Sequence, residues 1–476
     1  MGSVDRSALT RTVRGLWDDD ILPSLSELVA IPAISPGFDS QWAEHGHLVA
    51  AVAHVQAWIA ARDLPGLTTE VFELPGHAPL LLVDVPATRG STAQGTTVLY
   101  GHLDKQPPVA DWSPGLGPWT PVVKDGRLYG RGAADDGYAG YAAVAALEAL
   151  HAAGGAHGRC LVLLETSEES GSPDLPAYLA HLGDRLGDVS LVVCLDSGGN
   201  DYERMWLTTS LRGLVQVGLT VRVLDSGLHS GMASGIVPSS FRVARQLLDR
   251  IEDASTGEVL VREMHVDIPA NRIAEVREAV GAVPGALTAT VPFAGGTTAV
   301  EKDEVELALN GGWRPTLSIT GAEGLPPLDD AGNVLRPFTT LLLSFRLPPT
   351  ADAAVAFEAV EELLTTDVPY GASVELSRVE HAGGWNAPDL APWLRETLDQ
   401  AGEDIFGSPW RTVALGGSIP FMGLLHETYP DAQFLVTGAV GPDSNCHVPD
   451  ESLHLDQAAK VTEAVALVLD AHARQV

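Results

Sequence analysis

The sequence predicts an α/β protein in which a mixed, largely parallel sheet flanked by helices is interrupted by an inserted α+β domain. Up to Asp196, short apolar segments bounded by turn residues alternate with helical patterns, as in sheets whose parallel strands are joined by helices. After Asp196 the pattern changes to longer alternating segments, and from about Trp385 the first pattern returns. A chain of 476 residues is also too long for one ordinary core.

Helices are expected near the start of the chain. Apolar residues recur at helical spacing over residues 8–30, and this helix ends where Pro32 follows Ile31. A second helix is expected over residues 44–62, and an alanine-rich helix over residues 138–153 ends at a pair of glycines. The short apolar segments predict buried strands at residues 80–85, 97–101, 160–165 and 191–195.

The inserted domain is predicted to span residues 209–385, leaving residues 1–208 and 386–476 for the first domain. Residues 321–337, rich in glycine and proline, are expected to form a long loop. Within the insert, the pattern predicts strands at residues 214–224 and 339–347 and helices at residues 238–250 and 351–365. After the insert, it predicts a strand at residues 432–437 and a helix at residues 456–472.

Composition excludes several classes of partner. The net charge of −33, from 62 acidic and 29 basic residues, repels phosphate, so neither nucleic acid nor an anionic membrane is an expected partner. The sequence contains no apolar run of about 18 residues that would predict a transmembrane helix. Three scattered cysteines argue against a disulfide framework, and the first residues do not resemble a secretory signal. We therefore expect a cytoplasmic protein.

Polar residues follow two of the predicted strands directly. His102 and Asp104 come after the strand at residues 97–101, and Asp196 ends the strand at residues 191–195. Open α/β sheets present ligand-binding groups at the carboxyl ends of their strands. Asp104 could accept a hydrogen bond from the imidazole of His102 and fix its tautomer. Taken alone, such a His-x-Asp pair is more often a surface histidine in a loop.

Two pairs of adjacent carboxylates lie between these segments. Asp135 and Asp136 follow a glycine-rich turn and precede a helix, so one of them could cap that helix or bridge two cations. Glu168 and Glu169 follow the strand at residues 160–165. They could begin a solvated helix, or one could ligate a metal while the other takes a proton from water.

These residues together suit a centre for two divalent metal ions that share a bridging water. With His447, in a polar loop far downstream, the chain offers two imidazoles and several carboxylates and requires no thiolate. Hydrolysis of an amide bond is therefore the leading hypothesis. We find no Gly-x-Ser-x-Gly elbow, no nucleotide-binding glycine motif and no Cys-x-x-Cys pair.

Three segments resemble the signatures of a family of di-zinc metallopeptidases. They are residues 100–104 (Tyr-Gly-His-Leu-Asp), 128–137 (Leu-Tyr-Gly-Arg-Gly-Ala-Ala-Asp-Asp-Gly) and 168–172 (Glu-Glu-Ser-Gly-Ser). The family includes aminoacylases, glutamate carboxypeptidase, succinyl-diaminopimelate desuccinylase and carnosinase-like dipeptidases. Residues 106–108 (Gln-Pro-Pro) and 416–420 (Gly-Gly-Ser-Ile-Pro) resemble the carnosinase-like branch in particular.

The resemblance implies a zinc-exopeptidase type of catalytic domain with an inserted lid and dimerisation domain. It also implies a ligand set for two divalent ions, expected to be zinc, with manganese or cobalt as alternatives. In this set Asp135 bridges both ions. The remaining ligands are His102 and Asp196 for one ion and Glu169 and His447 for the other.

Further roles follow from the same resemblance. Glu168 would be the general base and then the general acid, and Asp104 would orient His102. His229 would reach across a homodimer to stabilise the oxyanion in the partner's active site. The substrate's terminal carboxylate would be bound by Arg346, Gly417 and Ser418.

The expected activity is hydrolysis of a dipeptide or related small peptide with a free terminal carboxylate, as in carboxypeptidases. Two alternatives remain open: an N-acyl-amino-acid deacylase, and a non-hydrolytic biosynthetic enzyme or binder on the same scaffold. Lys105 departs from the family pattern, because a small apolar residue usually stands beside the aspartate there. It could weaken the effect of Asp104 on His102 or point outward. The segment 321–337 departs as well.

Overall fold

The computed structural model describes residues 4–417 and 419–475. The first domain is built on a six-stranded sheet with the order β1-β2-β6-β3-β7-β19. Its four strands β6, β3, β7 and β19 run parallel; at one edge β2 pairs antiparallel with β6, and β1 pairs antiparallel with β2. The mixed, largely parallel sheet predicted from the sequence is therefore confirmed. The strands are β1 (Thr68–Phe72), β2 (Leu80–Val85), β3 (Thr96–His102), β6 (Arg159–Glu165), β7 (Val189–Cys194) and β19 (Gln433–Val436).

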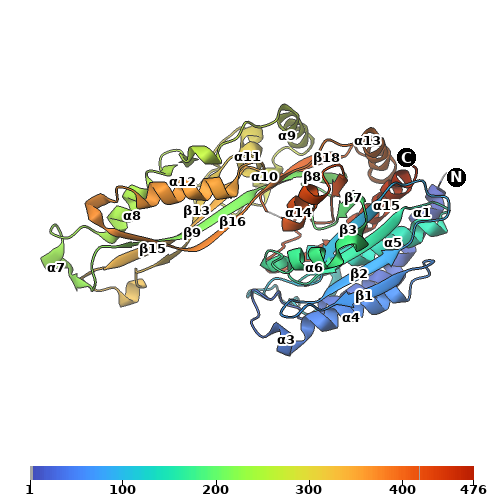
Figure 1. The fold of residues 1–476 in the computed structure, drawn as a ribbon, viewed down its shortest axis with the longest axis horizontal. Helices are drawn as coiled ribbons and strands as arrows, with labels where there is room; N and C mark the ends of the chain where they lie inside the picture. Colours follow the sequence, from blue (N-terminus) through green and yellow to red (C-terminus); the bar gives the residue numbers. More distant parts are fainter. Residues whose placement is uncertain (1–3, 418, 476) are drawn as a thin grey trace.

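Helices cover both faces of this sheet (Figure 1). Successive residues of a strand point to opposite faces, so Leu99 packs in one core and Val98 in the other. The core that contains Leu99 lies under α1 (Arg6–Leu16), α2 (Leu22–Val29), α4 (His47–Ala60), α5 (Ala139–Ala152), α13 (Pro392–Ala401) and α15 (Leu455–His472). The other core lies under α6 (Leu175–Leu182) and α14 (Pro420–Thr428).

The predicted helices are present, with two breaks. The helix predicted over residues 8–30 is interrupted by a π-helical turn at Trp17–Ile21, between α1 and α2. The helix predicted over residues 44–62 is divided at Gly46, which has a φ of 70° and separates α3 (Trp42–His45) from α4. A positive φ costs glycine little, because it has no Cβ.

The inserted domain contains a four-stranded antiparallel sheet with the order β13-β15-β9-β16. Its strands are β9 (Gly213–Arg222), β13 (Thr316–Glu323), β15 (Phe338–Leu347) and β16 (Ser373–Ala382). Helices α8 (Ser240–Leu248) and α12 (Ala353–Thr365) pack on one face of this sheet. At the end remote from the first domain, α7 (Ser230–Ala233) follows β10 (Leu228–His229), which pairs with β14 (Val334–Leu335) (Figure 1).

A small third sheet joins the two parts of the molecule. It consists of β17 (Trp385–Asn386), β8 (Trp206–Leu211) and β18 (Arg411–Leu415). The chain leaves it for the inserted sheet at Arg212 and returns after Ala382, so we propose domain boundaries close to residues 209 and 385. Helices α9 (Ala270–Ala282) and α11 (Glu304–Gly312), with α10 (Ala286–Ala289) between them, contact β18 rather than the inserted sheet.

The prediction of one long loop over residues 321–337 is wrong in part. β13 continues to Glu323, where it pairs with β15, and β14 covers Val334–Leu335. The side chains of β13 are mostly exposed, so the segment has no apolar run that would predict a strand. No helix in the described part of the chain combines the length and apolar character needed to cross a membrane.

Candidate metal centre

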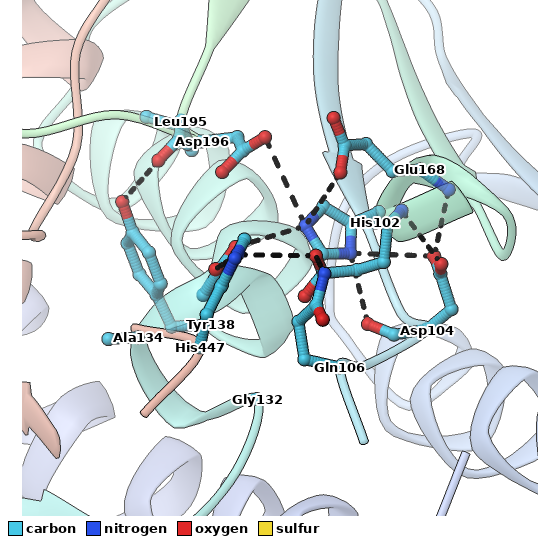
Figure 2. Close-up of polar contacts among 12 residues, drawn as sticks. His102, Asp104, Gln106, Gly132, Ala134, Tyr138, Glu168, Leu195, Asp196 and His447 are labelled. Carbon is cyan, nitrogen blue, oxygen red and sulfur yellow. Dashed lines mark hydrogen bonds and ion pairs between the residues drawn. The ribbon is translucent and has the colours of Figure 1, made fainter. Parts of the chain in front are cut away.

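Three neighbouring strands of the first sheet end at one place and deliver polar residues to it (Figure 2). His102 is the last residue of β3, and Asp196 follows β7 closely. Glu168 and Glu169 lie in a short helical turn just after β6. Because β3, β6 and β7 run parallel, their carboxyl ends coincide. This topology explains why residues far apart in the sequence meet.

His102 lies at the centre of one group of carboxylates. Its Nε2 atom is 3.3 Å from Oδ1 of Asp135, 3.9 Å from Oε2 of Glu168 and 4.0 Å from Oδ2 of Asp196. The imidazole is completely buried. Two sets of side chains each bring one atom per residue close enough to hold a metal ion: His102 with Glu168 and Asp196, and His102 with Asp135 and Glu169.

His447 approaches the same aspartate from the other side. Its Nε2 atom is 2.9 Å from Oδ2 of Asp135 and 3.3 Å from Oε2 of Glu169. The two oxygens of Asp135 therefore reach two different histidines. This is the geometry that a carboxylate bridging two cations requires.

The carboxylate of Asp104 organises the turn that carries the two glutamates. It accepts hydrogen bonds from the backbone N–H of Glu168 (3.2 Å) and of Glu169 (3.0 Å). Nδ1 of His102 lies 3.4 Å from the Asp104 carboxylate and 3.0 Å from the Asp104 backbone oxygen. Asp104 thus contacts both the histidine and the glutamate turn.

Several buried carboxylates lie close together in this centre, and their pKa values are shifted as a result. Burial and the charge of Asp196 raise the pKa of Glu168 well above its ordinary value, and burial raises that of Asp196 to about 6. Burial would also raise the pKa of Asp135, but hydrogen bonds with His102 and His447 hold it well below its usual range. Burial opposes a charged His102, yet Asp104 and Asp135 raise its pKa well above the usual value.

This centre fits a pair of divalent cations. Its carboxylates outnumber its imidazoles, and such an excess of buried negative charge is costly without a balancing cation. Oε1 of Glu169 is buried and finds no hydrogen-bond partner among the described residues. Imidazole nitrogens with carboxylate oxygens are a donor set that Zn²⁺ and related ions accept.

A cavity of about 500 Å³ opens onto this centre. Arg346 of β15 and Gly417 line it together with the carboxylates, so the two parts of the chain meet there. Gln106 lines it as well and donates a hydrogen bond to Glu169 (2.7 Å). Ser418, the third residue expected to bind the substrate's carboxylate, lies outside the described residues.

Two residues near the centre were missed in the sequence. Arg212, between β8 and β9, has a pKa lowered to about 10 by burial and by the charge of Arg346. Its Nε is buried and has no partner within the described ranges. Glu451 is buried and accepts hydrogen bonds from the turn that precedes Asp135. A lone arginine and a lone glutamate carry no distinguishing pattern in a sequence.

His229 does not join the other predicted residues within one chain. It lies at the tip of the inserted domain, is exposed, and accepts a hydrogen bond from the backbone N–H of Gly231 (3.2 Å) at the start of α7 (Figure 1). If His229 takes part in catalysis, it must do so in another molecule.

Lys105 is turned away from the centre and is fully buried. Its ammonium donates to the backbone oxygens of Leu28 (2.8 Å), Val29 (3.2 Å) and Ile31 (2.8 Å) at the end of α2. Burial lowers its pKa to about 7. The expected outward orientation is therefore wrong, because the buried ammonium satisfies the carbonyls that end this helix.

Comparisons with known proteins agree on one family. A model of peptidase family M20/M25/M40 matches residues 98–471. The cysteinylglycine-S-conjugate dipeptidase of Corynebacterium striatum is 28% identical over 374 residues, which cover 78% of this chain and 80% of the relative. The Beta-Ala-His dipeptidase of Homo sapiens is 26% identical over 461 residues, covering 92% of this chain and 87% of that protein.

Solved structures show the same fold. The dipeptidase Dug1p from Saccharomyces cerevisiae superposes with a TM-score of 0.77 at 19% identity and covers 98% of both chains. Human carnosine dipeptidase 1 has a TM-score of 0.73 at 21% identity, covering 98% of this chain and 99% of its own. With most of the chain matched, the protein belongs to peptidase family M20/M25/M40 and is a metal-dependent hydrolase.

Proposed function

We propose that the protein is a dipeptidase that binds two divalent metal ions, with zinc as the expected metal, and cleaves small peptides with a free terminal carboxylate. The observation that carries this proposal is the position of Asp135, whose two oxygens separately approach His102 and His447. The names of both curated relatives contain "dipeptidase", which supports the substrate class.

The proposed ligands divide into two groups around Asp135. His102 and Asp196 belong to one group, and Glu169 and His447 to the other. Ions held there would activate a water molecule and polarise the carbonyl oxygen of the scissile bond.

Glu168 is the proposed general base. Because Glu168 is not among the proposed ligands, its carboxylate stays free to accept a proton from a water held by the metal ions. Its Oε2 stands 3.9 Å from Nε2 of His102, beside the proposed ligands, and the residue lines the cavity. It can therefore take a proton from the attacking water and pass it to the leaving amine.

The two arginines at the domain junction provide the proposed carboxylate site. Arg346 lines the cavity, and Arg212 is close enough for their charges to repel each other. An anion placed between them would relieve this repulsion, and guanidinium groups match a carboxylate well. Gly417 is close by and can approach the substrate through its backbone.

A homodimer is the proposed working form, with His229 acting in the partner's site. The tip of the inserted domain exposes large apolar side chains: 77% of Met232 and 82% of Ile236 are accessible. Such clustered exposure is typical of surfaces that bind another protein. In this proposed dimer, His229 is the candidate donor to the oxyanion in the partner's site.

The first experiment compares Glu168→Gln with the wild-type protein. We expect turnover of dipeptides to fall by at least about a hundredfold, while metal content remains near two ions per chain because Glu168 is not a proposed ligand. A panel that also contains N-acyl amino acids distinguishes dipeptidase from deacylase activity. Loss of metal in the variant would instead make Glu168 a ligand, and a wild-type protein inactive on the whole panel would contradict the proposal.

A further inference from the structure

A buried tyrosine next to the metal centre has no role in the function proposed above. Tyr138 stands directly before α5, and its side chain is completely buried. Its hydroxyl donates a hydrogen bond to the backbone oxygen of Leu195 (2.5 Å), as Figure 2 shows, and accepts one from the backbone N–H of Ala439 (2.9 Å). A carbonyl oxygen only accepts and an amide N–H only donates, so both roles of the hydroxyl are fixed.

This hydroxyl lies where three ligand-bearing segments of the chain meet. Tyr138 itself follows Asp135 by three residues. The carbonyl group that accepts its hydrogen bond belongs to the peptide unit that leads into Asp196. Ala439 lies in the loop between β19 and His447. The tyrosine therefore contacts two of these segments at their backbones and is part of the third.

The two loops after β7 and β19 need the hydroxyl as a link. At the ends of these strands they bond directly, because the N–H of Thr437 donates to the backbone oxygen of Cys194 (2.9 Å). Beyond this bond, the oxygen of Leu195 and the N–H of Ala439 both pair with the tyrosine instead. Neither group has another hydrogen-bond partner in the described part of the chain. Loss of the hydroxyl would leave a buried donor and a buried acceptor unpaired, which is unfavourable enough to shift the loops.

Asp196 is the proposed ligand that depends most on this link. Its Oδ2 atom lies 4.0 Å from Nε2 of His102. Within the described residues, this is the only hydrogen bond or ion pair of the Asp196 carboxylate. The position of the carboxylate is therefore set by the backbone that carries it, and the hydroxyl of Tyr138 holds that backbone.

We propose that Tyr138 is a positioning residue of the metal centre, whose hydroxyl holds the peptide unit before Asp196 and thereby places this ligand. The inference rests on the proposed two-metal function and adds to it a residue outside the ligand set. Contacts that orient a ligand without touching the metal typically change metal affinity by about 10–100-fold when they are lost. The effect should fall on the ion that Asp196 binds. His447 is eight residues beyond Ala439, so the other ion should be affected much less.

The test compares two substitutions that each remove one buried hydroxyl. Tyr138→Phe removes the proposed link and keeps the aromatic ring. Tyr141→Phe is the matched control, because Tyr141 lies on the same helix and is equally buried, but its hydroxyl hydrogen-bonds with Ser24 (2.9 Å) and with none of the ligand-bearing segments. Denaturant unfolding of both variants measures the loss of stability that they share.

The metal-free proteins are then titrated with Zn²⁺ alone in a calorimeter. We expect two ions to bind to each protein, and one of them to bind Tyr138→Phe about 10–100-fold more weakly than the wild type. Tyr141→Phe should keep both wild-type affinities, even where its stability falls as much. Wild-type affinities in Tyr138→Phe would overturn the inference, as would an equal loss of affinity in Tyr141→Phe.

A double variant shows whether Tyr138 acts through Asp196. When Asp196→Ala has removed the ligand, adding Tyr138→Phe should cause no further loss of Zn²⁺ affinity, since the two effects share one path. A further loss as large as in the single variant would contradict the proposal. A wild type that binds no ion would overturn the proposed function together with this inference. Two ions bound equally by the wild type and Tyr138→Phe would overturn this inference alone.

Discussion

Glu451 connects the two loops that carry Asp135 and His447. Its carboxylate forms an ion pair with Arg131 (2.6 Å), and both side chains are buried. It also accepts hydrogen bonds from the backbone N–H of Gly132 (2.9 Å) and of Asp135 (3.3 Å). Because it follows His447 closely in the chain, it fixes the distance between the two proposed ligands.

Replacing Glu451 by Gln should therefore weaken metal binding and stability together. The amide cannot accept as many hydrogen bonds and leaves the buried charge of Arg131 without a counterion. We expect a loss of about 3–5 kcal/mol in the free energy of unfolding and a metal affinity lower by about 10–100-fold. Denaturant unfolding and titration of the metal-free protein measure these effects.

The exposed ion pair between Arg185 and Glu70 provides the control (2.7 Å). Glu70→Gln should cost no more than about 1 kcal/mol, since exposed pairs contribute little. Unchanged metal affinity in Glu451→Gln would show that the loops are positioned by other contacts.

Most of the predicted ligands could be found because they follow a strongly apolar strand or a glycine-rich turn, whereas His447, in a polar loop, was assigned through the family resemblance. His102, Asp196 and the Glu168–Glu169 pair all stand where a charge would be costly without a function, and the structure brings them together with Asp135 and His447. Glu451 and Arg212 could not be found in this way. Their importance comes from what surrounds them in the folded protein, and no local pattern records it.

α15 ends at a buried histidine whose protonation opposes folding. His472 is 3% exposed, and its two ring nitrogens lie near the hydroxyls of Thr97 (3.2 Å) and Ser190 (2.9 Å). Burial lowers its pKa to about 4 from an ordinary 6.5. The imidazole is therefore neutral in the folded protein.

This pKa predicts a loss of stability in mild acid. As the pH falls from 6.5 towards 4, the unfolded chain takes up a proton at this histidine before the folded protein does. The difference of about 2.5 pKa units corresponds to about 3 kcal/mol lost over this range. The His472→Gln variant keeps hydrogen-bonding groups but has no side chain that titrates at this position. Its free energy of unfolding should therefore fall less than that of the wild type over the same pH range. Parallel pH profiles for the two proteins would contradict the assignment.

Elements with a clear apolar pattern were predicted well, and those without one were not. The buried strands β3, β6 and β7 are continuous apolar runs, and their predicted bounds differ from the observed ones by only a few residues. β13 and β18 are largely exposed or half-buried, so neither has such a run. These strands depend on pairing with partners distant in the sequence, which a local pattern does not record.

The shape of the whole molecule separates His229 from the metal centre of its own chain. The inserted sheet extends away from the first domain and carries α7 at its far end (Figure 1). Met232 of α7 and Ile236 in the turn that follows it are also exposed at this end. A second copy that covered this apolar tip with its catalytic domain would receive the histidine at the same time.

A dimer that contains one defective Glu168 and one defective His229 tests this arrangement directly. Each homodimer, Glu168→Gln or His229→Ala, should be nearly inactive while still binding metal. In a heterodimer purified with two different tags, the His229→Ala chain keeps its own Glu168 and receives His229 from its partner. One of the two sites is then intact, so we expect roughly half of the wild-type turnover per dimer. If His229 acted within its own chain, both sites of this heterodimer would be defective, and the heterodimer would be as inactive as the two homodimers. An active monomer in sedimentation, or full activity of His229→Ala alone, would equally exclude the exchange.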